Sequence, residues 1–180
     1  MTDPSVPLDL ETTSGPVRLR AERPGDEAFL FALFRSHMLA EIAMMPVDDA
    51  TREALVRMQF QSQTATYRAR FPDARFDIVE VGNEPIGRIV IDPGGDTGCF
   101  VDFALAPDKR GQGRGTAIMA AVLAWFAPLG RPMRCKVMIH NEPSARMCRR
   151  VGFEQISADP PFLQLEWRPL PGQAARRTGA

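Results

Sequence analysis

The sequence predicts a single α/β domain with a mixed central sheet of about seven strands, flanked by four helices. Its 180 residues suffice for one domain with a buried core and are short for two. Along the chain, apolar residues switch repeatedly between the alternating spacing of strands and the wider spacing of helices. The candidate elements follow one another in the order β-α-α-β-β-β-α-β-α-β, which is typical of a sheet covered by helices.

The first half of the chain predicts one strand, two helices and a hairpin. Residues 17–22 alternate apolar and polar side chains, as a half-buried strand does. Residues 24–42 begin with a Pro and an Asp that favour a helix start, and residues 47–71 predict a second helix capped by Asp48 or Asp49. Residues 76–81 and 85–92 are two apolar runs joined by a short turn sequence, so they predict a hairpin.

The second half predicts three more strands and two more helices. Residues 99–105 are an apolar run that ends at a proline, and residues 113–127 then carry apolar side chains at helical spacing. Residues 133–139 predict a strand, and residues 143–150 a short helix with Pro near its start and Gly past its end. Residues 162–168 alternate and predict the last strand.

Composition limits the classes of partner. Residues 1–15 and 169–180 lack a period and predict flexible tails, which leaves 16–168 as the folded domain. Basic and acidic residues number 22 each, so no overall field attracts nucleic acid or an anionic membrane. Three cysteines without a CxxC motif predict neither a disulfide framework nor a metal site. With no signal peptide and no long apolar run, the sequence predicts a cytoplasmic protein.

The stretch "DKRGQGRG" at 108–115 places a glycine-rich loop between a strand and a helix start. Backbone N–H groups at a helix start lack partners and attract anions, and glycines allow a pyrophosphate close to them. Arg110 and Arg114 can add charge-assisted contacts. Thr116 stands where a dinucleotide-binding fingerprint needs glycine, and the phosphate-loop ending is absent too. A glycine-rich turn with solvated arginines is the alternative.

Two motifs resemble the Gcn5-related N-acetyltransferases, the GNAT family. "RGQGRG" resembles their Arg/Gln-x-x-Gly-x-Gly/Ala loop, and it follows "DFALAP", which resembles their fourth strand. Downstream, "NEPSARMCRRVGFEQ" is similar to their second signature. The resemblance covers residues 16–168 and implies a GNAT-like acyl-CoA N-acyltransferase fold. Its sheet would be mostly antiparallel, with the fourth and fifth strands, 99–105 and 133–139, diverging.

The resemblance also implies a binding site for acetyl-CoA in that gap. The pantetheine arm would pair with the strand edge at Phe103, Ala104 and Leu105, and a backbone N–H at this strand end would stabilise the oxyanion. The pyrophosphate would rest on the loop residues Arg110, Gly111, Gln112, Gly113, Arg114, Gly115 and Thr116. Asn141 would lie beside the pantetheine, or it would cap the short helix.

The sequence departs from the family at Cys148. Many members have a Tyr four residues before the glycine of the second signature, where its hydroxyl can protonate the departing CoA thiolate. A thiol is a weak hydrogen-bond donor, but its ordinary pKa of about 8.5 suits an acid. Cys148 is therefore a candidate catalytic acid, and a small buried apolar residue is the alternative. In the alternative case the thiolate leaves unaided, water protonates it, or the protein is no transferase.

A general base would have to accept a proton from the acceptor ammonium. Asp102 is the preferred candidate, because an acid within "FVDFAL" costs free energy unless it is exposed, paired or functional. Other candidates are His37, Glu41 and His140, and a water chain is a further alternative. A polar stripe on the second predicted helix could line the acceptor pocket or face solvent: Gln59, Gln63 and Tyr67.

Together these observations predict an enzyme that transfers an acetyl group from acetyl-CoA to a primary amine of a small molecule or peptide. We expect no metal, nucleic acid or membrane partner, and a monomer or homodimer. The alternative is an acyl-CoA-binding sensor or regulatory module without turnover, which the departure at Cys148 favours.

Overall fold

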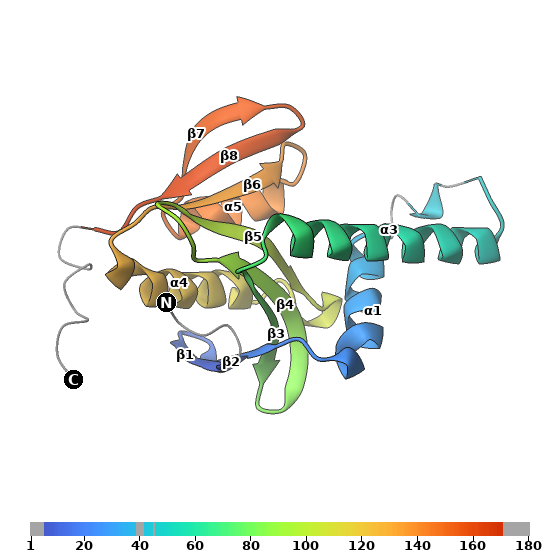
Figure 1. Ribbon diagram of the computed structural model, residues 1–180, viewed down its shortest axis with the longest axis horizontal. Coiled ribbons are helices and arrows are strands. Elements are labelled where there is room, and N and C mark those ends of the chain that lie inside the picture. Colours follow the sequence, from blue (N-terminus) through green and yellow to red (C-terminus); the bar gives the residue numbers. More distant parts are fainter. Residues whose placement is uncertain (1–5, 39–41, 45, 171–180) are drawn as a thin grey trace.

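The computed structural model describes residues 6–38, 42–44 and 46–170. It is a mixed α/β structure with an eight-stranded sheet in the order β1-β2-β3-β4-β5-β6-β8-β7 (Figure 1). Every strand pair is antiparallel except β5 with β6. The strands are β1 Leu8–Thr12, β2 Gly15–Ala21, β3 Arg75–Val81, β4 Glu84–Asp92, β5 Gly98–Leu105, β6 Met133–Met138, β7 Glu154–Asp159 and β8 Phe162–Trp167. The helices are α1 Glu27–His37, α3 Asp49–Arg70, α4 Arg114–Phe126 and α5 Glu142–Arg150.

The structure confirms the predicted fold class and adds two strands that the sequence patterns did not reveal. The expected N-terminal tail at 1–15 is wrong for β1, which pairs antiparallel with β2 from Leu8↔Leu19 to Thr12↔Gly15. Leu10 of β1 is buried in the core, and this burial accounts for the order of the strand. Strand β7 was missed because all its side chains are exposed, so it has no apolar alternation to detect.

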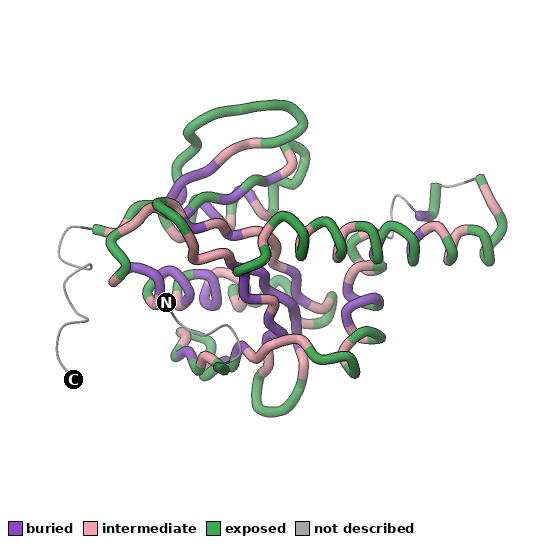
Figure 2. Tube along the Cα trace, viewed as in Figure 1, coloured by how far each residue is buried: buried purple, intermediate pink, exposed green. Residues whose placement is uncertain are grey.

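The two faces of the sheet carry separate apolar cores. Ile78 and Val79 are neighbours on β3 and point to opposite faces, as strand geometry requires. Ile78 packs with residues of α1 and α3, and Val79 belongs to the cluster that includes α4 and α5. Buried segments concentrate in the central strands and α4, whereas the β7 edge is exposed (Figure 2).

The start of α3 follows one of the predicted capping residues. The Asp48 carboxylate accepts a hydrogen bond from the Thr51 N–H at 2.9 Å, so Asp48 is the cap of α3. A short 3-10 turn at Pro24–Asp26 precedes α1. Within the described residues, no helix is both long enough and apolar enough to cross a membrane.

Strands β5 and β6 diverge after a short paired segment. They pair in parallel only where Gly98–Phe100 faces Met133–Cys135, while β6 continues to pair with β8 as far as Met138. The β4–β5 register shifts so that Phe100 and Asp102 face consecutive β4 residues and Val101 is the extra residue of a bulge. The predicted divergence is confirmed, and it leaves one edge of β5 unpaired from the bulge onward (Figure 1).

Candidate functional site

A cleft of about 850 Å³ lies where β5 and β6 separate. Side chains from both faces of the sheet reach it, because the missing strand pairing opens a passage between the layers. Helices α1 and α3 supply one wall, and α4 and α5 contribute the opposite one. A volume of this size is ordinary for a site that binds a small molecule or cofactor.

Most of the predicted site residues line this cleft. Its lining includes the predicted catalytic residues Asp102 and Cys148, the alternative bases His37 and His140, the predicted pantetheine contacts Phe103, Ala104 and Asn141, and the polar stripe Gln59, Gln63 and Tyr67. Glu41 lies outside the described residues. Leu105 and the glycine loop follow along the chain at the open end of the gap, beyond the lining.

The three glycines of the loop serve different purposes. Gly111 and Gly113 have φ angles of +80° and +73°, and a Cβ at either would meet nothing within 4 Å. Backbone conformation, and not lack of space, therefore favours glycine there. Gly113 is the N-cap of α4, so the loop turns into the helix start with its surroundings open. Gly115 differs, since a Cβ would lie 3.1 Å from the Met147 sulfur and would disturb the packing of α4 on α5.

Arg110 holds the loop against the rest of the site. Its Nε donates to the Leu105 carbonyl at 2.7 Å, and its Nη2 donates to Ser36 Oγ at 3.0 Å and lies 3.2 Å from His37 Nε2. These contacts direct the guanidinium toward β5 and α1, whereas the sequence predicted a contact with pyrophosphate. The Arg114 Nη2 lies 3.4 Å from the amide oxygen of Gln112, within the loop.

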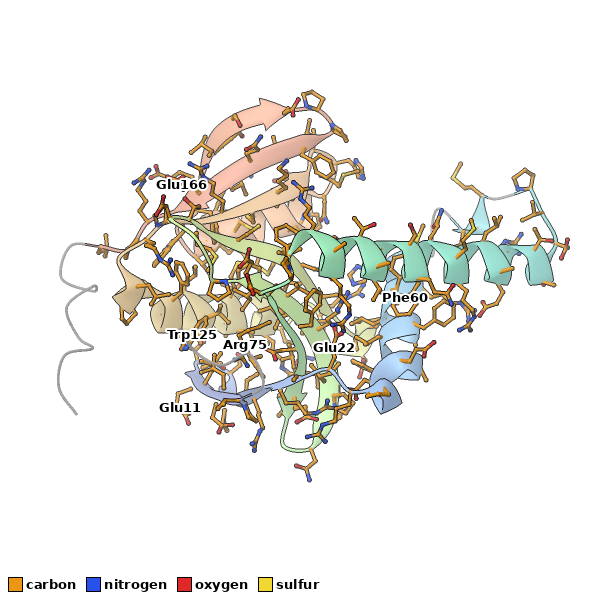
Figure 3. All side chains as sticks on the ribbon, viewed as in Figure 1. Glu11, Glu22, Phe60, Arg75, Trp125 and Glu166 are labelled. Atoms are coloured by element: carbon orange, nitrogen blue, oxygen red, sulfur yellow. The ribbon has the colours of Figure 1, made fainter. Side chains whose placement is uncertain are left out.

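Asp102 sits in a chain of charged side chains at the cleft. Its carboxylate lies 3.3 Å from Arg88 Nη1, and Arg88 Nε donates to Glu22 at 2.6 Å. Glu22 also accepts from Arg68 of α3 at 2.7 Å; Figure 3 labels Glu22. The Asp102 side chain is 27% exposed, compared with 6% for Arg88 and 5% for Glu22. Asp102 is the most exposed of these three side chains, and it lines the cleft together with Arg88.

Burial raises the pKa of Asp102 above its ordinary value, and the negative charge of Glu22 adds to that rise. The Arg88 charge and the Phe103 N–H lower the same pKa, but they do not compensate for burial. A carboxylate with a raised pKa is a better proton acceptor than an ordinary aspartate. Burial and the nearby Asp102 also raise the pKa of Tyr67 to about 12, so this hydroxyl stays protonated and can donate.

His37 is less suited to accept a proton. Burial and the Arg110 charge lower its pKa, and its Nε2 faces the Arg110 guanidinium. The ring is therefore neutral at neutral pH, with Nε2 accepting from Arg110. The contact with Arg110 gives His37 a role in positioning the loop, and it makes His37 a poorer general base than Asp102.

Cys148 is buried on the inner face of α5 against Cys135 of β6. Its exposure is 2%, and the two sulfurs are 3.8 Å apart. The hydrogen bond between the two thiols lowers the pKa of Cys148, and the same bond together with burial raises the pKa of Cys135. The burial matches the apolar alternative for Cys148, although the side chain also lines the cleft.

Asn141 caps α5. Its side-chain oxygen accepts from the Ser144 N–H at 3.2 Å, which is the helix-capping alternative predicted from the sequence. Asn141 also lines the cleft. The capping bond accounts for an Asn at this position without any ligand.

Three residues at the site were not among those predicted from the sequence: Arg88, Glu22 and Cys135. Arg88 carried a usable signal, since it is a charge within the apolar run "PIGRIVID", the same feature that singled out Asp102. Glu22 and Cys135 carried none, because their importance depends on neighbours distant in sequence. Among the described residues, no three His, Cys, Asp or Glu side chains group as metal ligands would.

Comparison with known proteins agrees with this geometry. A profile described as the Acetyltransferase (GNAT) family matches residues 39–153, which is more than half of the chain. The chain belongs to the GNAT family. This membership supports acyl-CoA-dependent acyl transfer as its general class of activity. No curated protein matched the sequence.

Solved GNAT structures share the fold at low sequence identity. Mycobacterium smegmatis RimJ, in complex with CoA-disulfide, is 20% identical with a TM-score of 0.64, covering 94% of this chain and 91% of its own. PaiA N-acetyltransferase from Thermoplasma acidophilum, in complex with coenzyme A, is 14% identical with a TM-score of 0.64, covering 84% and 98%. An acetyltransferase from Thermus thermophilus is 21% identical with a TM-score of 0.60, covering 91% and 100%.

Proposed function

We propose that this GNAT protein transfers an acetyl group from acetyl-CoA to a primary amine of a small molecule or peptide. The observation that carries the proposal is the gap between β5 and β6, which leads from a glycine-rich helix start to a cleft containing one partly exposed carboxylate. An extended thioester needs such a gap, and an amine acceptor needs a proton acceptor at its end.

The cofactor would lie along the free edge of β5. Its pyrophosphate would rest on residues 110–116, where the N–H groups at the start of α4 supply partial positive charge and Arg114 adds a full one. The pantetheine arm would pair with Phe103 and Ala104 as an added strand does. The Leu105 carbonyl already accepts from Arg110, so Leu105 contributes less to this pairing.

Asp102 would act as the general base. It would take a proton from the acceptor ammonium, and the free amine would attack the thioester carbonyl. A backbone N–H near the β5 bulge would stabilise the oxyanion, and collapse of the tetrahedral intermediate would release the CoA thiolate. The thiolate, with a pKa near 8.5, is a fair leaving group, so the transfer does not require Cys148 as an acid.

A second function is favoured by one specific observation. Cys148 stands where many GNAT members have a Tyr, and it is a short, buried side chain packed against Cys135 at the wall of the cleft. A protein without that acid could bind acyl-CoA as a sensor. Release of free CoA from acetyl-CoA with a broad panel of amines separates the two functions, because a sensor gives no amine-dependent release.

Gly113→Val tests the cofactor site. Position 113 has a positive φ, which valine adopts poorly, and the valine side chain would fill the open space over the helix start. The variant should therefore lose the rise in melting temperature that acetyl-CoA produces in the wild type. Gly82→Val is the matched control, since Gly82 also has a positive φ, +61°, and open surroundings but lies in the β3–β4 turn. Undiminished acetyl-CoA binding by Gly113→Val would show that the assigned cradle is wrong.

A further inference from the structure

Two thiols meet at the closed end of the β5–β6 gap. Cys135 is the last β6 residue that pairs with β5, opposite Phe100, so it marks the point where the gap begins. Cys148 approaches it from α5, with the sulfurs 3.8 Å apart, and both residues line the cleft. Neither is in a disulfide, and Cys99 is the third free thiol.

The direction of the gap relates this pair to the proposed cofactor. The glycine loop follows the end of β5 at Leu105, at the open end of the gap, and the thiols lie at the other end. Phe100 and Leu105 are five residues apart, which is about 17 Å of strand. A pantetheine arm anchored by its pyrophosphate at the loop therefore directs its sulfur end toward Cys135 and Cys148.

We propose that Cys135 and Cys148 form a thiol–disulfide exchange site for a disulfide of CoA. This inference rests on the proposed CoA site, because the same loop and gap would bring the disulfide bond to the two thiols. The ligand class is a disulfide that carries a CoA moiety, and the product is an intramolecular disulfide between β6 and α5. Such a bond would lock the closed end of the gap.

The exchange balances in two steps. The Cys148 thiolate attacks one sulfur of CoA disulfide, forming a Cys148–CoA mixed disulfide and releasing one CoA thiolate. The Cys135 thiolate then attacks the Cys148 sulfur, forming the intramolecular disulfide and releasing the second CoA thiolate. The two thiol protons end on the two released CoA molecules. The protein loses two electrons, and CoA disulfide gains them.

The surroundings of the two sulfurs decide the order of attack. The hydrogen bond between the two thiols and the Arg149 charge lower the pKa of Cys148, whereas the same bond and burial raise the pKa of Cys135. The thiolate is the attacking species, so Cys148 reacts first and Cys135 resolves the mixed disulfide. The distance between the Cys135 and Cys148 sulfurs must shorten from 3.8 Å to about 2.05 Å in the product. This requires a small movement of α5 against β6.

The full chain, reduced and then freed of reductant, is incubated with CoA disulfide and analysed by intact mass and thiol titration. The wild type should release two CoA per chain and keep one titratable thiol, Cys99. Cys135→Ser should stop at the mixed disulfide, with one CoA bound and one released. Cys148→Ser should form no CoA adduct, and Cys99→Ser, which removes a thiol outside the cleft lining, should react like the wild type.

Two further measurements test whether the CoA site brings the disulfide to the two thiols. Acetyl-CoA at ten times its dissociation constant should slow the exchange about tenfold by competition. A small uncharged disulfide such as hydroxyethyl disulfide, at the same concentration, should react far more slowly. Two outcomes would overturn the exchange site and leave the proposed function standing. One is an equal rate with both disulfides, and the other is a Cys135 and Cys148 pair that stays unreacted in protein that still binds acetyl-CoA. A chain that binds no acetyl-CoA would instead overturn the proposed function.

Discussion

Two arginines of this protein each contact two carboxylates, and the two clusters differ in how the acids are held. Arg20 donates to Asp26 at 2.7 and 2.8 Å and to Glu80 at 2.6 Å. Arg88 donates to Glu22 at 2.6 Å but reaches Asp102 only at 3.3 Å. The first cluster joins β2 and β3 to the start of α1, and the second borders the cleft.

The difference appears in the pKa values of the acids. The paired bonds from Arg20 lower the pKa of Asp26, and the Arg23 N–H, at 2.7 Å, lowers it further. Burial raises the pKa of Asp102, and the long contact with Arg88 and the Phe103 N–H do not offset that rise. Similar residue types thus give a carboxylate with a lowered pKa at one place and one with a raised pKa, the proposed proton acceptor, at another, and geometry makes the distinction.

Asp102→Asn should have the largest effect. Removing the proposed base should lower kcat by about 10²–10⁴-fold with a good amine acceptor. The melting temperature should stay equal or rise, because the amide avoids the cost of a buried charge while Arg88 keeps Glu22. Steady-state kinetics and thermal unfolding of both proteins check this. Wild-type turnover in Asp102→Asn would contradict the proposal that Asp102 is the general base.

Asp26→Asn should have the opposite profile, with intact turnover and lost stability. Breaking charged hydrogen bonds at a mostly buried acid should lower the free energy of unfolding by about 1–3 kcal/mol. The pKa of Asp26 is lowered by folding, so its contribution is present above the ordinary value of 3.8 and is lost as pH falls through the lowered pKa. The acid side of the wild-type stability curve should therefore be steeper than that of the variant.

Denaturant titration at several pH values measures this difference. Asp9→Asn serves as the control, because the Asp9–Arg18 contact is long, at 3.7 Å, and exposed, so its loss should change little. A comparable loss in both variants would mean that the Arg20 cluster has no special strength.

Glu22→Gln should have the smallest effect, a shift of the acid limb of kcat/KM to lower pH. Activity falls as the base is protonated, so this limb follows the pKa of Asp102. Removing the Glu22 charge takes away one contribution that raises that pKa and frees Arg88 to pair with Asp102. Glu80→Gln, in the Arg20 cluster, should leave the limb in place. A shift to higher pH in Glu22→Gln would contradict the assignment.

The sequence predicted the elements whose signals are local. The helix at α3 follows from its cap at Asp48, and the start of α4 follows from the glycine loop, whose φ angles only glycine adopts readily. Strands β1 and β7 escaped prediction because the first sits in a polar, proline-containing region and the second buries nothing. These two strands raise the six that the periodicities predicted to the eight of the sheet, where we expected about seven.

By itself, the sequence determined the family, the order of the elements with local signals and the location of the glycine-rich loop, because motifs and periodicities belong to contiguous residues. Only the tertiary structure decided that Arg110 turns to His37, that Asp102 shares Arg88 with Glu22, and that Cys148 touches Cys135. Each of these contacts joins residues far apart in the chain. Their charges and pKa values depend on distance and burial, which no local pattern of residues encodes.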